Sequence, residues 1–131
     1  MTPRGLFARF QDNVLAGRPG LDEGMLGDGT VVETPFSPEG HRRFEGRDAV
    51  AAMLEAGRGL PVEFEAFRRV VVHETADPDV IVAEYELVAR IPATGRRAAG
   101  AFVLVLRARD GRVAHWREYQ DVGAMARAFA A

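Results

Sequence analysis

Residues 100–121 read GAFVLVLRARDGRVAHWREYQD, and this stretch decides the fold. Its first half is almost continuously apolar and its second half alternates apolar and polar side chains, as β-strands do. Between the halves stand Asp110 and Gly111, a pair that favours a two-residue turn with positive φ angles. We therefore predict an antiparallel hairpin with strands over 100–109 and 112–122.

The turn also predicts which residues of the hairpin lie opposite each other. If Arg109 pairs with Arg112, two pairs share one side of the sheet: Val105 with Trp116, and Val103 with Glu118. The other side then carries three polar or aromatic residues of the second strand: His115, Arg117 and Tyr119. Both sides are partly apolar, so we expect one to pack on helices and the other on a second copy, in a homodimer.

Upstream patterns complete an α+β chain of helices followed by a mainly antiparallel sheet. Strands are predicted at 30–36 (TVVETPF, ended by Pro35), 62–75 (VEFEAFRRVVVHET) and 80–91 (VIVAEYELVARI). Three helices are predicted in the N-terminal half, at 3–17, 19–26 and 46–57, and a weak helical tail at 123–131. The segment 37–46 (SPEGHRRFEG) reads as a polar loop. At 131 residues we expect a single domain over 1–131.

Composition excludes several kinds of chemistry. The chain has no Cys, and all 17 of its basic residues are Arg, so thiolate nucleophiles, disulfides and lysine Schiff bases are impossible. The three His lack metal-ligand spacing, and we expect neither metal nor cofactor. A net charge of −2 gives no footprint for nucleic acid, and no apolar run is long enough for a membrane or a signal peptide. We expect a cytoplasmic protein.

Four stretches carry a resemblance to a known family: VVETPF (31–36), VHETADPDVIVAEYEL (72–87), TGR (94–96) and FVLVLRARDGRVAHWREYQD (102–121). Together they resemble the SnoaL-like group of the nuclear-transport-factor-2-like, ketosteroid-isomerase-like superfamily, over roughly residues 4–125. The resemblance implies a cone-shaped α+β barrel, in which a strongly curved sheet wraps three helices around an apolar pocket. It also implies that many members are dimers.

The branches of that superfamily assign different residues to catalysis. The polyketide cyclases imply one late acid–base carboxylate, here Glu118 or Asp121. The positions matching the steroid isomerase base and its oxyanion-binding residues hold Thr34, Phe10 and Val103, so that mechanism is not expected.

The limonene-epoxide-hydrolase branch implies a catalytic carboxylate at Glu118 and a pocket aromatic at Trp116. Its remaining acids and orienting groups align with Glu84, Glu86, Val31 and Glu33, so the orienting Arg, Tyr and Asn are absent.

We therefore expect Glu118, Asp121 and Glu33 as candidate catalytic acids, with these pocket residues: Trp116, Phe10, Phe36, Val103 and Val105. Burial beside an indole would raise the pKa of Glu118. Simpler roles stay open, because Glu118 can pair with an Arg of a neighbouring strand and Asp121 can cap the tail helix.

The leading expectation is a SnoaL-like small-molecule pocket protein. If it is an enzyme, it performs cofactor-free isomerase- or cyclase-type proton transfer on an apolar, oxygenated ring compound. The alternative is a non-catalytic ligand-binding or dimeric scaffold protein, and an epoxide-hydrolase-like hydrolase is the third possibility.

Overall fold

The computed structural model describes residues 1–129, except for the side chains of Met125 and Phe129. The helical elements are α1 (Pro3–Leu15), η1 (Glu23–Met25), α2 (Arg47–Ala56), η2 (Gly57–Gly59) and α3 (Val122–Phe129). The strands are β1 (Leu26–Ser37), β2 (Gly40–Glu45), β3 (Glu63–Glu74), β4 (Val80–Ile91), β5 (Arg96–Arg109) and β6 (Arg112–Gln120).

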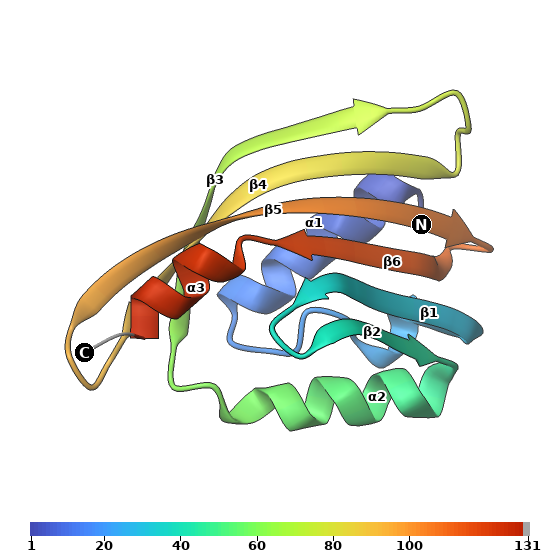
Figure 1. The fold of residues 1–131 in the computed structure, drawn as a ribbon. Coiled ribbons are helices and arrows are strands. Elements are labelled where there is room, and N and C mark those ends of the chain that lie inside the picture. Colours follow the sequence, from blue (N-terminus) through green and yellow to red (C-terminus); the bar gives the residue numbers. More distant parts are fainter. Residues whose placement is uncertain (130–131) are drawn as a thin grey trace.

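The strands of the described chain form one sheet in the order β2-β1-β6-β5-β4-β3 (Figure 1). Pairing is antiparallel throughout, apart from the parallel pair β1–β6. The predicted α+β class and the mainly antiparallel sheet are confirmed. No helix among the described residues is long and apolar enough to cross a membrane.

Helix α1 begins where the sequence predicts. The Thr2 hydroxyl accepts a hydrogen bond from the Gly5 amide at 3.0 Å, and Pro3 occupies the first turn, where its missing N–H costs nothing. The side chains that α1 buries recur at helical spacing: Leu6, Phe7, Phe10 and Val14. Figure 1 shows α1 lying across one side of the sheet, which we call the inner face.

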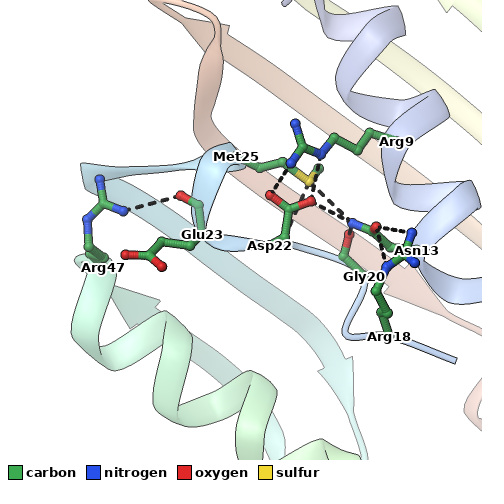
Figure 2. A network of polar contacts seen from close by, with 8 residues as sticks. All are labelled: Arg9, Asn13, Arg18, Gly20, Asp22, Glu23, Met25 and Arg47. Carbon is green, nitrogen blue, oxygen red and sulfur yellow. Dashed lines mark hydrogen bonds and ion pairs between the residues drawn. The ribbon is translucent and has the colours of Figure 1, made fainter. Parts of the chain in front are cut away.

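A polar network fixes the segment that follows α1 (Figure 2). Asn13, only 3% exposed, donates to the Gly20 carbonyl at 3.1 Å and to the Asp22 carboxylate at 2.9 Å. Arg9 adds two hydrogen bonds to Asp22, at 2.6 and 2.8 Å. Gly20 is required because a Cβ there would lie 2.6 Å from the Phe10 ring. The network therefore holds Gly20 close to the Phe10 ring.

Three expected elements differ from the structure. Residues 19–26 form only the 3-10 turn η1, and strand β1 continues two residues beyond Pro35 to Ser37. Pro35 is tolerated there because the β1–β2 register shifts between Thr34 and Ser37, which relaxes the need for its missing N–H. The predicted loop at 37–46 contains strand β2, which is polar because it is an exposed edge strand. Residues 130–131 of the predicted tail lie outside the described residues.

The hairpin is present, but its predicted pairing is wrong by one residue. The turn forms at Asp110 and Gly111, with φ angles of 53° and 75°, and Arg109 pairs with Arg112. The register then shifts, because Ala114 is an extra residue on β6 with no partner on β5. As a result the inner-face pairs are Leu106 with Trp116, Leu104 with Glu118, and Phe102 with Gln120.

This β-bulge divides the side chains of the sheet between two faces. The inner face forms the hydrophobic core against α1, with Leu104, Leu106 and Trp116 all 3% exposed or less. The opposite side, which we call the outer face, carries these members of β5 and β6: Val103, Val105, His115, Arg117 and Tyr119. The predicted separation of Trp116 and Glu118 from His115, Arg117 and Tyr119 is confirmed.

Candidate functional site

A cavity of about 310 Å³ lies on the inner face, between the sheet and the helices α1 and α3. It is lined by Phe10, Val14, Leu60, Val62, Phe64, Tyr85, Leu87, Ala89, Ile91, Ala98, Ala99, Gly100, Phe102, Glu118, Gln120, Ala124 and Ala128. Three of these side chains carry polar groups: Tyr85, Glu118 and Gln120. Broader hollows of about 720 and 840 Å³ also occur, and exposed residues make up most of their linings. The cavity on the inner face is the better candidate site, because its lining is mainly apolar and carries few polar groups.

Glu118 is the one carboxylate among the described residues that line the cavity. Strand alternation turns it inward from β6, and it is half-buried because the cavity reaches it while protein surrounds its other sides. Its Oε1 accepts a hydrogen bond from the Tyr85 hydroxyl at 2.9 Å, and its Oε2 accepts one from the Gln120 amide at 3.3 Å.

Burial raises the pKa of Glu118 above its ordinary value. Hydrogen bonds from Tyr85, Gln120 and Trp116 oppose this rise without cancelling it. The direction agrees with the sequence-based expectation. A carboxyl group of this kind holds its proton to higher pH than an exposed Glu does, which suits it to proton transfer with a bound ligand.

Tyr85 is the neighbour of Glu118 that the sequence did not identify as a site residue. It lies on β4, is 3% exposed, and has its pKa raised well above its ordinary value by burial and by the charge of Glu118. The phenol therefore stays protonated and keeps donating to Glu118. Alternation with Glu84 and Glu86 indicated that Tyr85 is buried, but nothing in the sequence indicated a partner 33 residues away.

Asp121 lies outside the cavity lining, at the start of α3. It is exposed, and its Oδ1 accepts a hydrogen bond from the Ala124 amide at 2.9 Å. This is the geometry of an N-terminal helix cap, which was the simpler of the two expected roles. Helix α3 brings Ala124 and Ala128 to the cavity.

Glu33 is buried, but on the outer face and not opposite Glu118. Its carboxylate lies 2.7 Å from His41 Nε2 and 2.5 Å from His115 Nε2, and it accepts a 3.3 Å hydrogen bond from Arg43. Burial alone would raise the pKa of Glu33. The hydrogen bonds from His41 and His115, with the charges of His115 and Arg117, outweigh burial and hold it below the ordinary value. We call this set of five residues the Glu33 cluster.

The five expected pocket residues are separated by the sheet. Phe10 lines the cavity, and Trp116 lies behind it in the core, with ring centroids 4.7 Å apart. Phe36 is 59% exposed and contacts Tyr119 instead. Val103 and Val105 lie on the outer face, because the bulge at Ala114 reverses their expected direction. The expectation that these two valines face Trp116 and Glu118 is therefore wrong.

The other candidates for hydrolase chemistry are also on the outer face. Glu84 lies 2.5 Å from His73 Nε2, and Glu86 pairs with Arg68. Among the described residues no group of three His, Asp or Glu side chains could hold a metal ion. The cavity consequently offers one carboxylate, two neutral hydrogen-bond donors and an apolar wall.

An apolar pocket beneath an α+β sheet, with a single acid on its floor, defines a class of small-molecule pocket proteins. The family model of the SnoaL-like domain matches residues 8–116, and the chain belongs to this family. It is 34% identical over 91 residues to an uncharacterised PhzA/B-like protein of Pseudomonas aeruginosa, covering 68% of this chain and 62% of that protein. The match thus spans less than two thirds of the relative.

Solved structures show the same fold. A candidate isomerase from Bacillus subtilis superposes with a TM-score of 0.84 at 22% identity, covering 97% of this chain and 91% of that one. A candidate polyketide cyclase from Pseudomonas putida KT2440 gives 0.77 at 18% identity, with 99% of both chains covered. The Δ5-3-ketosteroid isomerase from a Mycobacterium species gives 0.72 at 22% identity, covering 95% and 97%. The chain therefore has the nuclear-transport-factor-2-like, ketosteroid-isomerase-like fold.

Proposed function

We propose that this protein is a cofactor-free isomerase- or cyclase-type enzyme, which moves a proton on an apolar, oxygenated ring compound bound in the cavity. One observation carries the proposal: Glu118 stands on the floor of an apolar cavity with a raised pKa. A general base is most effective when its pKa lies near the working pH. A large fraction of it is then ionised, and it still binds the transferred proton strongly. The solved relatives described as isomerases and cyclases agree with this class of reaction.

The proposed reaction has two steps. The ionised Glu118 removes a proton from a carbon next to a carbonyl group, so a C–H bond breaks and an O–H bond forms on Glu118. The electron pair moves onto the conjugated oxygen of the substrate. Glu118 then returns the proton to another atom of the same conjugated system, which restores the carboxylate. Tyr85 and Gln120 hold Glu118 in place through both steps.

Hydrogen–deuterium exchange into 2-tetralone tests the proposal. This neutral two-ring ketone has acidic C–H bonds, and NMR in D2O follows their loss. We expect the protein to accelerate exchange, and Glu118→Gln to reduce the acceleration by about a thousandfold, since a positioned general base contributes about 10²–10⁴-fold. Glu84→Gln, on the outer face, is the matched control and should change nothing. If the protein binds 2-tetralone without accelerating exchange, the non-catalytic ligand-binding alternative is favoured.

We also propose that the outer face pairs with a second copy in a homodimer, and that the sheet curves into the cone that the family resemblance implies. The outer face exposes apolar side chains at the following positions: Val71 (47%), Val103 (37%) and Phe36 (59%). Such surface is costly for a monomer to leave in water. Sedimentation at micromolar concentration should show a dimer, and Val103→Asp should shift it towards the monomer. A wild-type monomer would contradict this part of the proposal.

A further inference from the structure

The described residues that line the cavity carry charge of one sign only, which is negative. Glu118 is its one ionisable group besides Tyr85, and no Arg or His belongs to the described lining. A ligand in this cavity therefore meets a negative charge and no positive one.

Three arginines that are adjacent in sequence to lining residues point or pair away from the cavity. Arg117 precedes Glu118 but points to the outer face, where it lies near the Tyr119 ring. Arg90 and Arg97, on the strands that form the cavity wall, pair with Glu63 and Glu65. A carboxylate or phosphate ligand would have to place its charge beside Glu118 and against an apolar wall, which is strongly unfavourable.

The hydrogen bonds of Glu118 show what the ligand can offer instead. Each carboxylate oxygen has two acceptor sites, Tyr85 and Gln120 occupy one on each oxygen, and Trp116 also donates to the carboxylate. A neutral hydroxyl group can use a remaining site. The volume of about 310 Å³ lies at the lower end of ligand pockets, which run from about 300 to 1,000 Å³. This size suits roughly two fused rings and is small for the four rings of a steroid.

We infer that the ligand of this site is a neutral, two-ring-sized phenol or enol that donates one hydrogen bond to Glu118, and that carboxylated analogues are rejected by Glu118 itself. The inference deepens the proposed function and rests on it in taking the cavity as the site of reaction. It concerns binding alone, so it is measured without any turnover.

The test compares the binding of 2-naphthol, 2-naphthoate and estradiol by calorimetry, in the full chain and in Glu118→Gln. In the wild type, 2-naphthol should bind at least about 30-fold more tightly than 2-naphthoate. In Glu118→Gln, which removes the charge but keeps the shape, naphthoate binding should improve and naphthol binding should weaken. The Kd of 2-naphthoate divided by the Kd of 2-naphthol should then fall by about tenfold or more relative to the wild type. A collapsed or misfolded cavity would weaken the binding of both ligands. Changes of opposite sign in the two affinities would therefore be specific to the charge of Glu118.

The control Glu84→Gln should keep the wild-type ratio. Naphthoate binding the wild type within about threefold of naphthol, or a ratio unchanged by Glu118→Gln, would overturn the inference. Estradiol carries the same phenol on four rings, and binding as tight as that of naphthol would overturn the size limit. If the charge selectivity is found but 2-tetralone exchange is not accelerated, the ligand class stands and the proposed reaction fails.

Discussion

Glu118 and Glu33 are both shielded by protein, and both stand on central strands of one sheet, yet their surroundings differ completely. Glu118 faces an apolar cavity and accepts hydrogen bonds from neutral groups only. Glu33 lies on the outer face among two His and two Arg side chains. Burial pushes both pKa values upward, but only Glu33 has enough compensation to end below its ordinary value.

The difference shows that burial alone does not make a carboxylate reactive. In the Glu33 cluster the carboxylate is surrounded by cations and hydrogen-bond donors, and the members of the cluster join β1, β2 and β6 across the outer face. Glu118 has no positively charged partner among the described residues that contact it, so burial keeps its pKa raised and its proton available for transfer. Four measurements would break or sharpen this contrast.

The largest effect on stability is expected from Glu33→Gln. The variant removes the negative charge beside Arg117 and leaves Arg43 with only its 3.6 Å ion pair to Glu45, and it should lower the free energy of unfolding by about 2 kcal/mol at pH 7. Because the folded pKa of Glu33 is lowered, its contribution exists above the unfolded pKa and disappears as the pH falls through the folded pKa. Urea unfolding at several pH values checks this. A difference that persists unchanged at about pH 3 would contradict it.

Tyr85→Phe should act on Glu118 without removing it. Its hydroxyl lowers the pKa of Glu118, so its loss should move the acidic limb of the 2-tetralone exchange profile to higher pH. At neutral pH the rate should fall about fivefold, the worth of one hydrogen bond. Tyr119→Phe, on the outer face, is the control. An unshifted acidic limb would mean that Tyr85 only fills space.

Glu118→Gln should change stability in the direction opposite to Glu33→Gln. A carboxyl group with a raised folded pKa favours the folded state only while protonated, and that contribution is lost as the pH rises through the folded pKa. At pH 7 the uncharged variant should therefore be more stable, by about 1 kcal/mol, a rise in Tm of roughly 3 °C. The gain should vanish near pH 4. A variant less stable than wild type at pH 7 would show that Glu118 has a compensating cation.

Asp121→Asn should have the smallest effect. Asn caps a helix about as well as Asp, so stability should change by less than about 0.5 kcal/mol, while Asp121→Ala should cost about 1 kcal/mol. Neither variant should alter 2-tetralone exchange per folded molecule. A large loss of exchange in Asp121→Asn would transfer the acid–base role from Glu118 to Asp121.

Local sequence was sufficient for much of this structure. The alternation around Glu118 and the Asp110–Gly111 turn predicted the hairpin, the two faces of β6 and the direction of the Glu118 pKa shift. Strand β2 was missed because an exposed edge strand shows no apolar alternation. The parallel β1–β6 pairing, which places Glu33 beside His115, joins residues more than 80 positions apart. The Tyr85–Glu118 hydrogen bond depends on pairing across three strands, which no local pattern encodes.

The unpaired Ala114 has a consequence for how this fold can change during evolution. Deleting Ala114 would leave Val113 opposite Ala108 and His115 opposite Arg107, so both faces of β6 would be kept. If Ala114 instead paired with Arg107, the alternation of side chains would present His115, Arg117 and Tyr119 to the interior in place of Trp116 and Glu118. The cavity would then be lined by a guanidinium group instead of a carboxylate, and would select anions. A shift of one residue in the β5–β6 register, with no change in sequence length, would thus convert the proposed site for neutral molecules into one for acids, with the same strands and helices around it.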